Sequence, residues 1–88
     1  MATLAMIYGI IIKMNSEKNA KHHRAHIHAW YSGSEAVFDV ETMEKIEGEF
    51  PRRQELIVKG FIAVHLDELR ANWKLLNEEN GTYFRITD

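Results

Sequence analysis

The stretch that decides the fold spans residues 26–41 and reads HIHAWYSGSEAVFDVE. Two runs rich in aromatic and β-branched residues flank a short polar segment, which is the pattern of a β-hairpin. A two-residue Gly33-Ser34 loop of the glycine-first type would place Ala29 opposite Phe38. This register gives the hairpin one continuous apolar face, so we predict two antiparallel strands that pack on a core.

The opposite face of this hairpin gathers polar residues. His26, His28 and Trp30 are spaced two apart, so their side chains leave a strand on the same side. In the predicted register, Asp39 lies across from His28. A loop of any even length preserves this sorting of faces, whereas a three-residue loop would place the histidines opposite apolar residues. We expect both imidazoles and the indole to project outward, away from the apolar side.

The flanking segments complete an α+β pattern. Residues 4–14 are apolar on both alternating faces and predict one covered strand, and residues 45–50 predict a short further strand before a proline. Residues 52–79 have helical periodicity. Their apolar stripe consists of Val58, Ile62, His65, Leu69, Trp73 and Leu76.

The predicted fold is therefore an antiparallel β-meander of three to four strands with C-terminal helical structure on one face. The helical part is either one long helix or two short ones, and His65 is expected to be a hydrogen-bonded core residue. Residues 83–86 could return as a final edge strand.

Length and composition limit the class of protein. Eighty-eight residues predict a single domain over residues 1–88, and 45% hydrophobic with 27% charged residues indicate a globular chain. The chain has no cysteine, which excludes disulfides and thiolate metal ligands and favours a cytoplasmic setting. The apolar run at residues 4–12 is too short to span a bilayer and lacks the flanks of a secretory leader. The net charge of −2 argues against bulk attraction to nucleic acid.

The histidines are candidate metal ligands. His26 and His28 could converge on one divalent ion such as zinc, and His22 could approach from the preceding loop as a third ligand. Asp39 could orient an imidazole.

The same imidazoles could instead act without a metal. A general acid/base pair beside Lys21 and Arg24 could cleave a phosphodiester. The structural alternative is that histidines opposite carboxylates only stabilise the sheet surface. These three interpretations stay open.

Other residues are candidates for binding a partner. A tryptophan outside the main core indicates a covered surface, either a protein interface or a stack with an RNA base. Two arginines at the start of the predicted helix oppose its dipole, so they either pair with nearby glutamates or hold an anionic partner. The candidate partner-binding residues are Trp30, Arg24, Arg52 and Arg53.

These motifs together resemble a family of small bacterial proteins known only as a domain of unknown function. Its signature reads roughly His-x-Pro-Pro-His-Phe-His-Ala-x-Tyr, followed by an acidic β-segment, a turn and a helix with Glu-Leu and Trp. The matching residues in this chain are His22, His26, Ile27, His28, Ala29 and Tyr31, then 38–42 and 48–53, and then His65, Glu68, Leu69, Asn72 and Trp73. The two prolines of the signature are replaced here by Arg24 and Ala25, so the entry into the strand is less rigid.

The resemblance implies a partner protein, because such proteins are often encoded beside another small protein in an arrangement similar to toxin–antitoxin pairs. We therefore expect a cytoplasmic protein that binds a partner protein, a second copy or RNA. The alternative is a small metal- or histidine-dependent, ribonuclease-like hydrolase with His26, His28 and Asp39 at its site. The sequence alone does not decide whether the chain is an enzyme.

Overall fold

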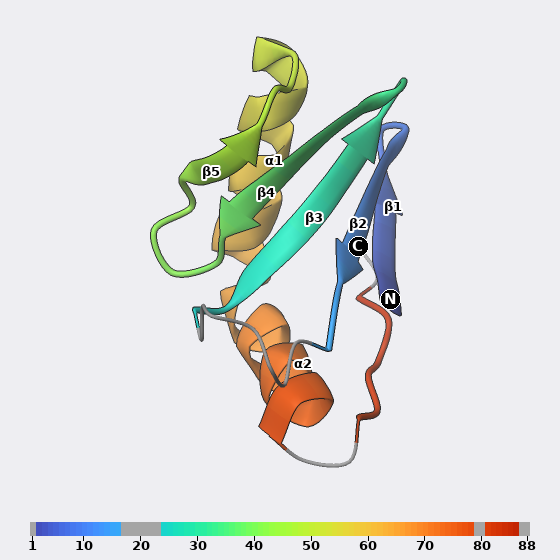
Figure 1. The fold of residues 1–88 in the computed structure, drawn as a ribbon, viewed down its shortest axis with the longest axis vertical. Coiled ribbons are helices and arrows are strands. Elements are labelled where there is room, and N and C mark those ends of the chain that lie inside the picture. Colours follow the sequence, from blue (N-terminus) through green and yellow to red (C-terminus); the bar gives the residue numbers. More distant parts are fainter. Residues whose placement is uncertain (1, 17–23, 79–80, 87–88) are drawn as a thin grey trace.

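The computed structural model describes residues 2–16, 24–78 and 81–86. Within these residues, one five-stranded antiparallel sheet has its strands in sequence order, and two helices follow (Figure 1). The α+β meander is confirmed, although the predicted number of strands, three to four, was too low. The elements are β1 (Ala2–Ile7), β2 (Ile10–Met14), β3 (His26–Tyr31), β4 (Ser34–Asp39), β5 (Lys45–Gly48), α1 (Arg52–Val64) and α2 (Leu66–Glu78).

The additional strand arises from a turn inside residues 4–14. Tyr8 and Gly9 have φ values of 47° and 77°, and positive φ at both central residues is the backbone of a two-residue type I′ hairpin turn. β1 and β2 therefore pair with each other, with Ile7 across from Ile10. The prediction of one strand was wrong because an aromatic residue rarely adopts the left-handed conformation, so a lone glycine gave only a weak turn signal.

The β3–β4 hairpin turns one residue earlier than predicted. Ser32 and Gly33 both have positive φ, at 47° and 84°, because this turn is also of the type I′ form. The loop is even in length, so the apolar and polar residues sort onto the two faces as predicted. The partners shift by two residues, however, and His26 rather than His28 lies across from Asp39.

The helical segment is broken at His65, where φ is −110° and ψ is 28°. α1 buries Val58, Phe61 and Ile62 and lies along one face of the sheet. α2 lies beyond the end of the strands rather than along the same face (Figure 1). Two short helices are thus observed, one of the two alternatives that the sequence allowed.

Hydrogen bonds and apolar side chains hold α2 in this position. Leu69, Trp73 and Leu76 are buried in the core. The Ser16 hydroxyl donates to the carbonyl of Leu76 at 2.9 Å, and the Asn77 side chain donates to the carbonyl of Asn15. These bonds tie α2 to the chain that leaves β2.

His65 has part of the role that its place in the apolar stripe predicts. Its ring packs on Phe61, with the ring centroids 4.7 Å apart. Its Nδ1 atom lies 2.6 Å from a carboxylate oxygen of Glu68. The predicted polar contact is present, but His65 is only partly buried and lies at the edge of the core rather than in it.

The C-terminal segment lies beside β1. The Ile86 N–H donates to the carbonyl of Leu4 at 2.8 Å, and the Ile86 side chain is buried. This single main-chain bond does not make residues 83–86 a strand, so the predicted edge strand is not formed. In the described part of the chain, neither helix combines the length and the apolar character needed to cross a membrane.

Candidate functional site

Neither of the two helices in the described part of the chain runs along the sheet face opposite the side that α1 covers (Figure 1). Two rows of side chains cross this face, and each row contains one residue from each of four neighbouring strands. One row runs from Met6 on β1 to Glu35 on β4, and the other runs from Lys13 on β2 to Glu47 on β5. We call this surface the open face, and its residues are Met6, Ile11, Lys13, His28, Trp30, Glu35, Val37 and Glu47.

Trp30 lies near the centre of the open face and is partly exposed. Lys13 extends over its ring, with Nζ 5.7 Å from the ring centroid, which is within the range of a cation–π contact. The indole nitrogen is buried and has no hydrogen-bond partner among the residues that the structure describes. The sequence predicted this side of the strand for Trp30 correctly.

His28 lies in the row next to that of Trp30. Two polar groups of the described residues contact its ring. The Asn15 side-chain N–H donates to Nε2 at 3.2 Å, and Nδ1 lies 3.2 Å from a carboxylate oxygen of Glu35. One ring nitrogen of His28 therefore faces an amide N–H, and the other faces a carboxylate. A shallow hollow of about 250 Å³ lies against His28, Glu35 and Glu47.

The carboxylate beside His28 therefore differs from the one that the sequence predicted. The register predicted from the sequence places Asp39 beside His28, whereas the observed neighbours are Glu35 and Asn15, which were not predicted. The error follows from the one-residue displacement of the turn, because moving the turn by one residue moves each cross-strand partner by two.

His26 leaves β3 on the predicted side but is buried, so the expectation of an outward-projecting imidazole was wrong. The residue is only 6% exposed, and its ring centroid lies 5.0 Å from that of Trp73 on α2. Its Nδ1–H donates to the carbonyl of Arg24 at 2.8 Å. Because the break at His65 directs α2 past the end of the sheet, Trp73 covers the first histidine of β3 and leaves the second one accessible.

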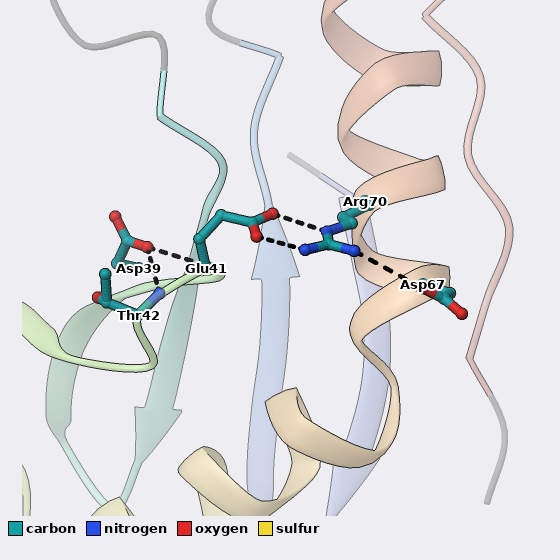
Figure 2. Close-up of polar contacts among 5 residues, drawn as sticks. All are labelled: Asp39, Glu41, Thr42, Asp67 and Arg70. Carbon is teal, nitrogen blue, oxygen red and sulfur yellow. Dashed lines mark hydrogen bonds and ion pairs between the residues drawn. The ribbon is translucent and has the colours of Figure 1, made fainter.

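Asp39 is buried at the end of β4, where its carboxylate organises the turn towards β5. One oxygen accepts hydrogen bonds from the N–H groups of Glu41 and Thr42, both at 2.8 Å, as Figure 2 shows. The other oxygen lies 2.5 Å from the guanidinium of Arg24. Burial works to raise the pKa of Asp39, but the two backbone N–H groups and Arg24 outweigh it, so that the pKa lies below its usual value.

The same turn is joined to α2 by a bidentate ion pair (Figure 2). The Arg70 guanidinium donates to both carboxylate oxygens of Glu41, at 2.8 and 2.6 Å. These hydrogen bonds lower the pKa of Glu41 and raise that of Arg70. Asp67 approaches the same guanidinium from the first turn of α2 at 3.8 Å. The contact between Glu41 and Arg70 was not predicted from the sequence, because it joins segments that are far apart in the chain.

The remaining candidates are not on the open face. Arg52 and Arg53 are exposed at the start of α1, which packs on the other side of the sheet. In the described part of the chain neither makes an ion pair, since Glu55 pairs with Lys45 and Lys59 instead. His22 lies outside the described residues, so its predicted role as a metal ligand stays a prediction.

A metal site would need at least three suitable side chains close together. No such group of histidine, aspartate and glutamate side chains occurs in residues 2–16, 24–78 and 81–86. The rings of His26 and His28 approach edge to face, with centroids 5.5 Å apart. His26, His28 and Asp39 therefore lie near one another, but each has structural partners.

The fold and the open face together define a class of small α+β protein. In this class, one helix covers one side of a meander, a second helix lies beyond the strand ends, and a surface with a histidine and a tryptophan occupies the other side. The chain belongs to the family described as domain of unknown function DUF4160, whose model matches residues 9–74. These residues include β2 to β5, α1 and most of α2. No curated protein and no solved structure matches the chain.

Proposed function

We propose that this chain is a cytoplasmic protein that binds a partner protein through the open face, as one component of a two-gene module similar to toxin–antitoxin pairs. The observation that carries the proposal is the position of Trp30. A large aromatic side chain near the centre of a sheet face that no described helix covers is a typical anchor for a protein interface.

The chemistry of the open face favours a protein partner. Met6, Ile11 and Trp30 form an apolar row across β1 to β3, whereas Glu35 and Glu47 give the β4–β5 side an acidic character. A partner with apolar side chains above the row and a basic side chain near the glutamates would complement both halves. The acidic side disfavours the phosphate backbone of RNA, so a protein is the better fit.

Replacing Trp30 with alanine tests this proposal. We expect Trp30→Ala to weaken binding of the protein encoded by the adjacent gene at least about 30-fold, because a buried aromatic anchor contributes about 2 kcal/mol or more to an interface. Titration calorimetry with the purified proteins measures this change, and circular dichroism checks that the variant is folded.

Tyr83→Ala is the matched control, since Tyr83 is an exposed aromatic residue in the C-terminal segment. This variant should bind like the wild type. Unchanged affinity in Trp30→Ala, or the absence of a complex between the two proteins, would contradict the proposal.

A second candidate function is hydrolysis of a phosphodiester, and one observation favours it. His28 is paired with the carboxylate of Glu35 at the edge of the hollow described above, and a histidine oriented by a carboxylate is a common general base. In this alternative, His26 and His28 act at the site, with Asp39 as a positioning residue and a divalent metal as the candidate cofactor.

Metal content and RNA cleavage by the untagged protein test this alternative. It predicts cleavage that His28→Ala abolishes while the fold is retained. In its metal-dependent form, the alternative further predicts that the wild type contains stoichiometric metal and that His26→Ala/His28→Ala does not. Protein without cleavage activity would leave partner binding as the function of the open face.

A further inference from the structure

The two edges of the sheet differ in what lies beside them. At β1, the Ile86 N–H donates to the carbonyl of Leu4, so the C-terminal segment covers part of that edge. β5, at the other edge, pairs with β4 on its inner side and has no described strand on its outer side (Figure 1). We call the outer side of Lys45–Gly48 the β5 edge.

The backbone of the β5 edge determines what kind of ligand can bind there. In an antiparallel pair, alternate residues direct their N–H and C=O groups away from the partner strand. No main-chain hydrogen bond of residues 45–48 other than those with β4 occurs in the described part of the chain. Such a row of main-chain donors and acceptors is complementary to another extended segment, which adds to the sheet as a further strand.

The β5 edge carries two features that restrict pairing and one that favours it. Charged side chains and bulges commonly protect edge strands, and β5 has both. Its bulge residue is Ile46, which lies between the residues that pair with Phe38 and Val37. Ile46 is 47% exposed, and an exposed large apolar side chain in the middle of an edge favours association. The charges and the bulge therefore select which strand can be added, while Ile46 offers that strand an apolar contact.

The charge around the β5 edge is acidic. Glu44, Glu47 and Glu49 are exposed, and none of them makes an ion pair in the part of the chain that the structure describes. The cation of this stretch, Lys45, is paired with Glu55 of α1 at 3.2 Å. The carboxylates at this edge therefore lack counter-charges among the described residues.

An added strand would lengthen the rows of the open face by one position. The row that runs from Lys13 to Glu47 would gain a residue directly beside Glu47. Opposite charges at neighbouring positions of a sheet stabilise the pairing of two strands, and like charges destabilise it. A lysine or arginine is therefore favoured beside Glu47. The same rule disfavours a second copy of β5, since this would bring the carboxylates of two chains together.

From the open edge, the exposed Ile46 and the surrounding carboxylates, we infer that the β5 edge binds an extended basic segment of another protein, which adds to the sheet beside β5. Main-chain hydrogen bonds supply the affinity, and a basic side chain beside Glu47 supplies the selectivity. The inference does not depend on the proposed function, because it concerns the edge of the sheet and not contacts to Trp30.

Peptide binding to the full chain tests the inference. The probe is a synthetic peptide in which lysine and valine alternate. One comparison peptide has glutamate in place of each lysine, and the other has a proline at the centre of the lysine peptide. We expect an NMR titration to show binding of the lysine peptide at least about tenfold tighter than that of either comparison peptide, because glutamate repels the edge and proline interrupts strand pairing. The amides of residues 45–48 should shift and become protected from hydrogen exchange.

Charge reversal at the β5 edge tests its selectivity. Glu47→Lys/Glu49→Lys should weaken binding of the lysine peptide at least about tenfold and should favour the glutamate peptide. Both residues are exposed, so the circular dichroism spectrum should match that of the wild type. Glu78→Lys is the matched control, because Glu78 is an exposed glutamate at the end of α2, and it should bind the lysine peptide like the wild type.

Any one of four results would overturn the inference. The first is a lysine peptide that does not bind the wild type. The second is equal binding with and without the central proline, because this would show charge attraction without strand pairing. The third is a set of shifts confined to the amides around Trp30, which would place the peptide on the open face. The fourth is a wild-type dimer whose β5 amides are protected without peptide, because this would assign the edge to a second copy of the chain.

Discussion

Replacing Gly48 with alanine is expected to destabilise the protein by about 3 kcal/mol or more. Gly48 has a φ of +85°, and a Cβ atom there would lie 2.3 Å from the carbonyl oxygen of Glu35 on the neighbouring strand. The variant therefore combines an unfavourable backbone conformation with a clash between the new Cβ atom and the main chain of β4. No side-chain rotation can relieve this clash. Urea unfolding followed by circular dichroism measures the loss.

Gly33→Ala is the matched control for this prediction. Gly33 has nearly the same φ, +84°, but a Cβ atom there would meet nothing within 4 Å. Gly33→Ala should lower the free energy of unfolding by only about 1 kcal/mol, which is the cost of the backbone conformation alone. Equal losses in the two variants would show that β4 and β5 are not as close at Gly48 as the structure has them.

Removing the carboxylate of Asp39 is also expected to destabilise the protein strongly. Asp39→Ala deprives the N–H groups of Glu41 and Thr42 of their acceptor and leaves Arg24 without its partner. Since hydrogen bonds to a charged group contribute about 1.5–3 kcal/mol, we expect a loss of about 3 kcal/mol in the free energy of unfolding. A loss below about 0.5 kcal/mol would contradict the role of Asp39 in organising this turn.

The pH dependence of stability separates the charge of Asp39 from its hydrogen bonds. Because the folded-state pKa of Asp39 is lowered, its contribution is present above the unfolded-state pKa of about 3.9 and is lost as the pH falls through the folded-state value. Wild-type stability should therefore fall as the pH drops below about 4. Asp39→Asn retains an oxygen acceptor for the two N–H groups and should show a weaker decline in this range.

The sequence predicted the sorting of side chains onto the faces of the β3–β4 hairpin because both candidate turns have two residues. Moving such a turn by one residue shifts the cross-strand partners by two, and this preserves the faces. It did not predict the register, since Ser32-Gly33 and Gly33-Ser34 are both acceptable two-residue turns. The prediction of Asp39 beside His28 failed for this reason. The turn at Tyr8 and Gly9 was missed because both halves of residues 4–14 are apolar and give no contrast between a strand and a hairpin.

The sequence by itself determined the α+β architecture, the helical stripe from Val58 to Leu76 and the common side of His26, His28 and Trp30, because these follow from local periodicity. Only the tertiary structure decided which of these residues is accessible. Trp73, far along the chain, covers His26, while His28 stays at the surface with Glu35 as its partner. Such contacts depend on the direction that α2 takes after His65, and local sequence carries little information about the angle between two packed elements.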